Sequence, residues 1–158
     1  MKKIIFVCNG NICRSPMAKS ILEKLLKDKK IKDKYAVFSC GINAVNGLDM
    51  NDNAKKVLKE NKIKPCNHLS KRLDEKDILS SDYVITMTTE QKEFLENYNN
   101  VYSLNDLTKC GEIVDPYGED YAVYQKVFDT LFKSMNNLIK FLESEVWFIL
   151  PTTMVELS

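Results

Sequence analysis

The stretch that decides the fold is Val7-Cys8-Asn9-Gly10-Asn11-Ile12-Cys13-Arg14-Ser15-Pro16. It follows a short apolar run at residues 4–7, which predicts a buried strand, and it precedes an amphipathic helix that begins near Ser15. We therefore expect a loop between the C-terminal end of a strand and the N-terminus of a helix. In open α/β sheets ligands bind at such a place, and the unpaired N–H groups of the helix favour an anion.

The loop carries a cysteine and an arginine at a spacing suited to phosphate chemistry. Cys8 and Arg14 have five residues between them, which allows a turn that aims successive backbone N–H groups at one point. Gly10 and Asn11 tolerate the left-handed conformations that such a turn needs. Amide donors, the helix N-terminus and Arg14 favour a thiolate on Cys8, and the hydroxyl of Ser15 can donate to its sulfur. Arg14 adds a planar, permanent charge that matches two oxygens of a phosphoryl group.

Taken singly, these residues also have an ordinary interpretation. Cys8 could be a small buried residue at a strand end, and Arg14 could be a surface side chain. The combination Cys-x5-Arg-Ser at a strand-to-helix junction is far more specific, so the sequence favours a phosphate-binding loop with a nucleophilic thiol. The loop lacks the Gly-Lys-Ser/Thr ending of a Walker loop, so nucleotide binding is not implied.

A second chemical element follows later in the chain, at Asp115-Pro116-Tyr117-Gly118. Pro116 fixes its own φ angle and pushes Asp115 toward an extended conformation. Alone, these residues fit an ordinary turn before the last helix. Beside a phosphate-binding loop, the carboxylate of Asp115 becomes a candidate to protonate a leaving group and then to activate water. Tyr117 either walls the cleft or is simply exposed.

Predicted strands and helices alternate along the chain. Strands are expected at residues 4–7, 35–39, 82–87 and 101–104, and helices at residues 17–30, 53–61, 89–98 and 121–142. This alternation predicts a single-domain α/β three-layer sandwich, with a parallel sheet of about four strands in the order 2-1-3-4 and helices on both faces. The loop after the first strand then lies at the switch point of the strand order.

Composition limits the other classes of function. The chain has 158 residues, 44% of them hydrophobic and 28% charged, with a net charge of +1, so bulk electrostatics gives no reason to expect nucleic acid as a partner. Five cysteines without a Cys-x2-Cys pair, and a single histidine, make a structural zinc site improbable. No apolar run is long enough to span a membrane. We expect a cytoplasmic protein with reduced thiols.

Cys8 to Pro16 resembles the signature of the low-molecular-weight protein tyrosine phosphatase family. Further matching points are residues 39–41, His68, residues 82–87 and residues 115–118, and they resemble the bacterial branch that contains protein-arginine phosphatases. The resemblance implies a thiol-based phosphatase that needs no metal or cofactor. On this resemblance, residues 1–144 form the phosphatase domain, and residues 145–158 form an apolar tail of unknown role outside it. For that tail an edge strand, a partner contact and a disordered end are all open.

The resemblance also suggests supporting roles. It implies that Ser39 and His68 hydrogen-bond toward Asn11 and hold the loop in shape. A Cys-His hydrolase that uses Cys8 and His68 is the competing interpretation, but it leaves Arg14 unexplained. Cys13 is either a buried thiol or a resolving thiol for oxidised Cys8, since the family carries a cysteine there.

The expected reaction is hydrolysis of a phosphorylated protein or peptide by a monomer or weak dimer, without nucleic acid or membrane. Ile12 is the residue of tyrosine-specific members, whereas arginine phosphatases carry Thr there, so phosphotyrosine is favoured and phosphoarginine is the alternative. Thr88, where the family often has Asp, resembles the arginine phosphatases. A non-catalytic phosphate-binding module is a weaker alternative, and the closely spaced cysteine pair of an arsenate reductase is missing.

The predicted site residues fall into three groups. They are catalytic Cys8, Arg14 and Asp115; substrate-binding Asn9, Gly10, Asn11, Ile12, Cys13, Ser15 and Tyr117; and supporting Ser39 and His68.

Overall fold

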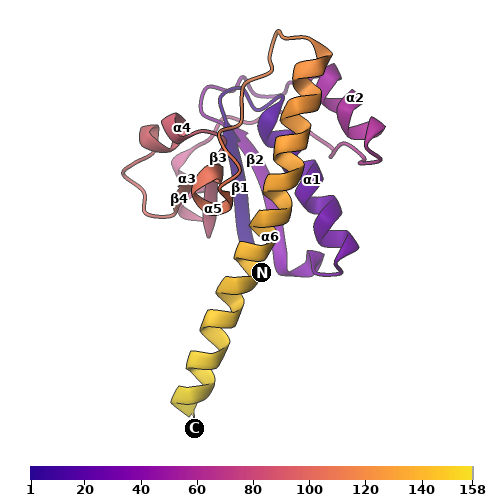
Figure 1. Cartoon of the computed structure of the whole chain (residues 1–158). Coiled ribbons are helices and arrows are strands. Elements are labelled where there is room, and N and C mark those ends of the chain that lie inside the picture. The colour runs from indigo at the N-terminus through magenta and orange to yellow at the C-terminus, as the bar shows by residue number, and fades with distance from the viewer. Residues whose placement is uncertain (158) are drawn as a thin grey trace.

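A computed structural model describes the backbone of residues 1–157 and the side chains of residues 1–145. Its centre is a four-stranded parallel sheet in the order β2-β1-β3-β4 (Figure 1), which confirms the predicted strand order. The strands are β1 (Lys2–Cys8), β2 (Tyr35–Gly41), β3 (Tyr83–Thr86) and β4 (Val101–Ser103). Because all four run in one direction, their C-terminal ends meet at a single edge.

Helices cover both faces of the sheet, as predicted. They are α1 (Arg14–Asp28), the 3-10 helix η1 (Lys32–Lys34), α2 (Asp52–Glu60), α3 (Glu75–Leu79), α4 (Thr89–Phe94), α5 (Leu104–Thr108) and α6 (Tyr121–Leu157). Alternate residues of β1 point to opposite faces, so that Phe6 packs in the core that includes α1 and α6, whereas Ile5 packs with Ile78 of α3 and Val101 of β4. These two cores make the three layers.

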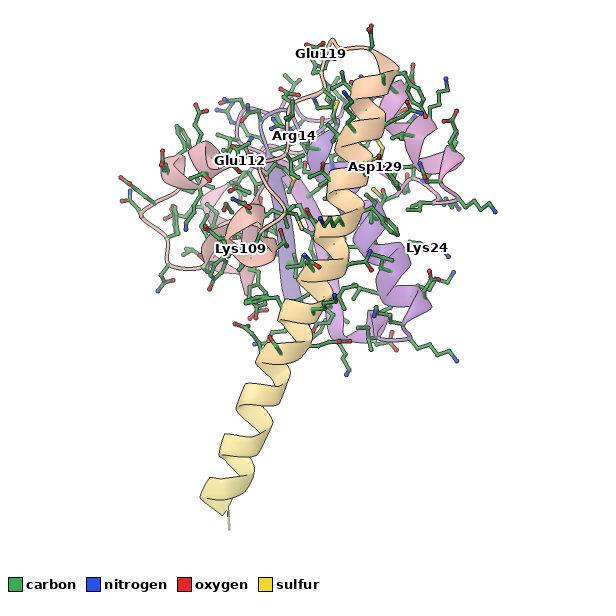
Figure 2. All side chains as sticks on the ribbon, in the orientation of Figure 1. Arg14, Lys24, Lys109, Glu112, Glu119 and Asp129 are labelled. Atoms are coloured by element: carbon green, nitrogen blue, oxygen red, sulfur yellow. The ribbon has the colours of Figure 1, made fainter. Side chains whose placement is uncertain are left out.

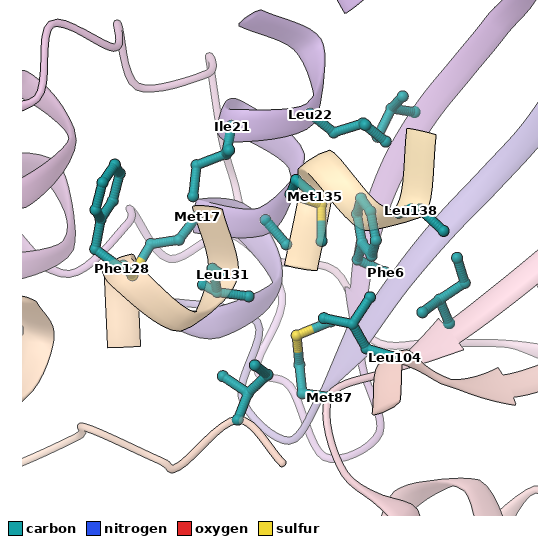
Figure 3. Packing of buried hydrophobic residues seen from close by; sticks show 14 of the residues in the cluster. Phe6, Met17, Ile21, Leu22, Met87, Leu104, Phe128, Leu131, Met135 and Leu138 are labelled. Carbon is teal, nitrogen blue, oxygen red and sulfur yellow. The ribbon is translucent and has the colours of Figure 1, made fainter. Parts of the chain in front are cut away.

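The larger core lies between the sheet and the two long helices. Figure 3 shows Phe6 and Met87 from the sheet side beside Met17 and Ile21 of α1 and Leu131 of α6. All five side chains are fully buried. The helical spacing of apolar residues in α1 and α6 puts these side chains on one face of each helix, and burial of those faces holds both helices against the sheet.

Three differences from the predicted elements concern helices. α4 ends at Phe94 instead of residue 98. α3 and α5 are absent from the predicted elements, because five residues are too few to show helical periodicity. Both carry a reciprocal capping box, Asp74 with Asp77 in α3 and Ser103 with Asp106 in α5, which pairs the first free N–H groups of a short helix.

The third difference is the length of the last helix, which runs from Tyr121 to Leu157. Residues 145–157 are therefore helical backbone and form no edge strand. Figure 1 shows this part of α6 continuing past the body of the molecule. The other two interpretations of the tail, a partner contact and a disordered end, concern side chains outside the described residues. None of the helices within the described residues combines the length and apolar character needed to cross a bilayer.

Candidate active site

The phosphate-loop residues lie where β1 ends and α1 begins. Cys8 is the last residue of β1 and Arg14 is the first residue of α1, so the loop spans residues 9–13 at the C-terminal edge of the sheet. Gly41 of β2 is paired with Cys8, and Thr86 of β3 is paired with Val7. The loop therefore emerges between two neighbouring strands, at the switch point of the strand order.

The sulfur of Cys8 is surrounded by hydrogen-bond donors. The backbone N–H of Asn11 donates to Cys8 Sγ over 3.3 Å, and Ser15 Oγ lies 2.9 Å from the same sulfur. Asn11 Nδ2 donates to Ser15 Oγ over 2.8 Å, which leaves the Ser15 hydroxyl hydrogen available to donate to the sulfur. Only 3% of the Cys8 residue surface is exposed. Such donors stabilise a thiolate more than a thiol.

Asn11 is the residue that bends the loop. Its φ angle is +57°, in the left-handed region, and it is fully buried. Its side-chain amide donates to Ser39 Oγ over 3.0 Å as well as to Ser15, and its side-chain oxygen accepts from the backbone N–H of Lys71 over 2.9 Å. Gly10, which also tolerates this conformation, does not adopt it. One left-handed residue is enough to turn the N–H of Asn11 onto the sulfur.

Arg14 is a buried cation held in one orientation. Its side chain is 5% exposed, and Nη1 donates to the backbone oxygen of Ile113 over 3.0 Å. Nη2 lies 3.6 Å from Asp115 Oδ2. Because Ile113 and Asp115 belong to one loop, this single side chain connects the two chemical elements that the sequence places about a hundred residues apart.

Asp115 lies at the mouth of the site and not at its floor. Its side chain is 53% exposed, and Oδ1 accepts the backbone N–H of Tyr117 over 3.1 Å. Tyr117 is 66% exposed. The carboxylate is therefore supported from within its own loop and keeps one oxygen toward Arg14.

These residues enclose a cavity of about 210 Å³. It is lined by Cys8, Gly10, Asn11, Ile12, Cys13, Arg14, Asp115 and Tyr117. The structure thus brings together all three residues predicted to be catalytic and most of those predicted to bind substrate. Asn9 lines a neighbouring recess instead, and Ser15, Ser39 and His68 lie behind the loop, where they contact Cys8 and Asn11.

His68 supports the loop from outside the cavity. Its Nε2 lies 2.7 Å from the backbone oxygen of Asn11. A carbonyl oxygen can only accept, so Nε2 carries the proton in this contact. Burial lowers the pKa of His68 below its usual 6.5, and the hydrogen bond to Asn11 opposes that shift only in part. His68 is therefore favoured in its neutral form as an Nε2–H donor.

Cys13 is a buried thiol of different character from Cys8. Burial raises the pKa of Cys13 to about 11, and its hydrogen bond with Tyr124 opposes this shift. The two side chains are 3.5 Å apart at Cys13 Sγ and Tyr124 Oη. At neutral pH Cys13 is therefore a neutral thiol at the cavity wall, which does not favour it as a nucleophile.

Sequence reasoning missed two residues that contact the loop. The buried amide of Gln91 donates to Asn9 Oδ1 over 3.0 Å, while its oxygen accepts the backbone N–H groups of Met87 and Thr88. The Thr88-x-x-Gln91 capping box was the signal that could have revealed it. Gly41 packs so closely under the loop that a Cβ atom there would lie 2.6 Å from the backbone oxygen of Asn9.

Metal ligands are not gathered in this site. Within the described residues there is no group of three or more His, Cys, Asp or Glu side chains that could hold a metal ion. The cation that lines the cavity is the guanidinium of Arg14, which suits an anion.

Comparison with known proteins gives a consistent family. The sequence model described as "Low molecular weight phosphotyrosine protein phosphatase" matches residues 3–147. The low molecular weight protein-tyrosine-phosphatase PtpB of Staphylococcus aureus is 32% identical over 134 residues, which cover 82% of this chain and 91% of that protein. A protein-arginine-phosphatase of Geobacillus stearothermophilus is 34% identical over 150 residues, which cover 90% of this chain and 97% of that protein. The crystal structure of a YwlE mutant from Bacillus subtilis superposes with a TM-score of 0.84 at 29% identity, over 90% of this chain and 99% of that one.

Gly41→Ala is expected to destabilise the protein by about 1–3 kcal/mol, because overpacking forces the backbone apart. The added Cβ would lie 2.6 Å from Asn9 O and 2.9 Å from Asn11 N, and neither backbone atom can give way without moving the loop. Gly10→Ala is the matched control, since its Cβ would meet nothing closer than 3.9 Å. Urea unfolding measures both, and equal stabilities of the two variants would contradict the prediction.

His68 predicts a specific dependence of stability on pH. The unfolded chain binds a proton at His68 near pH 6.5, whereas burial lowers the pKa of the folded state. The unfolded state therefore binds more protons between the two values, and stability falls as the pH decreases below about 6.5. Urea unfolding of wild type and His68→Gln from pH 8 to pH 5 should show a steeper fall for wild type. Parallel curves would show that His68 does not titrate on unfolding.

Proposed function

The chain belongs to the low molecular weight phosphotyrosine protein phosphatase family of cysteine-dependent hydrolases, and from this premise we propose that it hydrolyses phosphotyrosine through a phosphocysteine on Cys8. One observation carries the proposal: Cys8, Arg14 and Asp115 line a single cavity of about 210 Å³. A nucleophile, a phosphoryl-binding cation and an acid are the three groups that a thiol-based phosphatase needs.

In the first step the Cys8 thiolate attacks phosphorus and the bond from phosphorus to the tyrosine oxygen breaks. Arg14 and the loop N–H groups hold the phosphoryl oxygens as charge spreads over them in the transition state. Asp115, at the mouth of the cavity, gives its proton to the departing oxygen, so that tyrosine leaves as a neutral phenol. Asp115 enters this step protonated, with Oδ2 placed 3.6 Å from Arg14 Nη2 on the side where the leaving group departs.

In the second step water attacks the phosphocysteine. Asp115, now ionised, takes a proton from this water, the bond from phosphorus to sulfur breaks, and phosphate leaves. The electrons of that bond return to Cys8 Sγ, where the Asn11 N–H and the Ser15 hydroxyl stabilise the thiolate. These donors thus lower the energy of both the attacking and the departing sulfur.

The proposal of phosphotyrosine rests on Ile12 in the cavity wall. The side chain of Ile12 lines the cavity, and its backbone oxygen accepts the N–H of Asn51 over 2.9 Å, which fixes its position. A branched apolar side chain suits the face of a phenyl ring better than it suits a charged guanidinium. Tyr117, which also lines the cavity, offers an aromatic surface.

Phosphoarginine is the second candidate substrate, and the similarity of the chain favours it. The Geobacillus relative at 34% identity is a protein-arginine-phosphatase. Thr88, the residue that caps the start of α4, is also a point of resemblance to the arginine phosphatases. With phosphoarginine the bond from phosphorus to nitrogen would break, and Asp115 would protonate the guanidinium nitrogen. The same three catalytic residues serve either substrate.

The proposal also covers the setting of the reaction. We infer that residues 1–144 are the phosphatase domain, that the chain acts as a monomer or weak dimer, and that phosphorylated proteins or peptides are its partners. All five cysteines are free thiols, which suits a reducing compartment, and on that ground we infer a cytoplasmic location.

Removal of the proposed nucleophile or acid should stop turnover. Cys8→Ser is expected to lower kcat for a phosphotyrosine peptide by about a thousandfold or more, and Asp115→Asn by about a hundredfold or more because general acid catalysis is lost. The assay is run in chelator, with Cys66→Ser as the control for loss of a thiol outside the cavity. Turnover retained in Cys8→Ser would exclude the phosphocysteine. Phosphate binding by wild type without turnover would indicate a binding module.

Ile12 is expected to select the substrate. Wild type should hydrolyse a phosphotyrosine peptide faster than a phosphoarginine peptide, and Ile12→Thr should shift the ratio of kcat/KM toward phosphoarginine by about tenfold. Val45→Thr makes a similar exchange of an apolar for a polar branched side chain at an exposed position and should leave the ratio unchanged. An unchanged ratio in Ile12→Thr would show that this residue does not select the substrate.

A further inference from the structure

A second recess of about 470 Å³ opens beside the catalytic cavity. Arg14 and Asp115 line both, so the two are neighbours on either side of the proposed acid. The recess extends from there between the loop after β2, at residues 42 and 43, and the start of α4, at residues 88–91. Its third wall is the segment of residues 112–114, which leads to Asp115.

The recess is acidic beyond the phosphate site. Glu90 and Glu112 line it, and Arg14 is its only cationic lining residue within the described part of the chain. Arg14 is 5% exposed, and its Nη1 is bound to Ile113 O, so it serves the catalytic cavity. Within the part of the chain that the structure describes, neither glutamate is in an ion pair. The nearby Lys92 of α4 does not neutralise them, because it is paired with Asp106 at 2.6 Å.

One of the two glutamates is held in place by the fold. Glu112 Oε1 accepts the backbone N–H of Thr89, the first residue of α4, over 2.9 Å. This bond fixes the carboxylate at the wall of the recess. Figure 2 shows Glu112 and Arg14 at the same end of the molecule. A cation bound here would contact a carboxylate that the Thr89 N–H already holds in place, so binding would cost little further side-chain entropy.

The rim of the recess is apolar. Phe94 is 73% exposed and Val114 is 65% exposed, and Ile42, which also lines the recess, is half-buried. Single exposed apolar side chains are common, but two at the rim of one recess beside a catalytic cavity provide a contact surface for an apolar side chain.

We propose that this recess binds the residues next to the phosphorylated residue of a protein substrate, and that it selects substrates with a lysine or arginine and an apolar residue there. The inference rests on the proposed phosphatase function and names its substrate class. A phosphorylated side chain in the catalytic cavity brings its own backbone to the mouth near Asp115. The next residues of an extended chain, at about 3.3–3.6 Å each, then reach Glu90 and Glu112. An acidic flank would be repelled by the same two carboxylates.

The glutamates also have an ordinary structural role, since acidic residues in or near the first turn of a helix favour its N-terminus. That role predicts a change in stability and no dependence on the charge of the substrate. The two explanations are therefore separated by substrate preference.

The experiment compares two phosphotyrosine peptides of equal length, one with arginine and one with glutamate on both sides of the phosphotyrosine. For wild type we expect kcat/KM to favour the basic peptide by about fivefold or more at low salt, as for a few surface ion pairs. In Glu90→Gln/Glu112→Gln the preference should fall to near one. The ratio is taken within each variant, so any general loss of catalysis divides out.

The matched control is Glu93→Gln/Glu96→Gln. It removes the same net charge from exposed positions on and just after α4 that do not line the recess. This control should keep the wild-type preference for the basic peptide. If both double variants lose it equally, the preference comes from the overall charge and the recess is not the binding site.

para-Nitrophenyl phosphate, which has no flanking residues, tests the proposed phosphatase activity separately from substrate selection by the recess. If wild type hydrolyses this compound and has equal kcat/KM for the two peptides, the proposal that the recess selects substrates is wrong. The proposed phosphatase activity is then unaffected. The absence of turnover of all three substrates would overturn the proposed function and this inference together. If Glu90→Gln/Glu112→Gln keeps the preference for the basic peptide, the recess is not the source of that preference and the proposal is wrong.

Discussion

The hydrogen bonds of Asn11 are the constraint on which the site depends. A left-handed backbone at a non-glycine residue costs roughly 1 kcal/mol or more and persists only where its surroundings over-determine it. Here the side-chain amide and oxygen of Asn11 contact Ser15, Ser39 and the backbone of Lys71, and its carbonyl oxygen accepts from His68. The left-handed backbone at Asn11 directs its N–H toward Cys8 Sγ. Side chains and backbone from separate parts of the chain thus converge on one turn.

The parallel sheet is what brings those parts together. Ser39 is near the end of β2 and Cys8 ends β1, so their neighbours across the sheet are fixed by the strand register. The end of β3 contributes Met87, whose backbone N–H donates to both Val7 O and Gln91 Oε1, and the amide of Gln91 continues to Asn9. A fold with strands in alternating directions would scatter these ends over two edges. The loop is therefore a property of the sheet edge as much as of its own residues.

The sequence was sufficient where the chemistry is local. The loop from Cys8 to Arg14 and the carboxylate of Asp115 could be predicted, because each consists of residue types at a short spacing or beside a proline. Periodicity likewise predicted the strands and the long helices, and their alternation along the chain predicted the strand order. The contacts of Gln91 and Gly41 with the loop could not be predicted in this way, since they join residues about thirty or more positions apart in the chain. Gly10 tolerates a left-handed conformation but does not adopt it, because residue propensity permits a conformation without requiring it.

The proposed nucleophile is more tightly constrained by its surroundings than the proposed acid, and this difference suits a two-step reaction. The nucleophile must keep one position, and Cys8 is buried with its sulfur bound by two donors. The acid must serve a leaving group in one step and a water in the next. Asp115 is half exposed and 3.6 Å from Arg14 Nη2, which is longer than a charged hydrogen bond of about 2.7–2.9 Å. Electrostatic attraction thus keeps this carboxylate at the cavity without locking it, so one side chain can carry a proton in both directions.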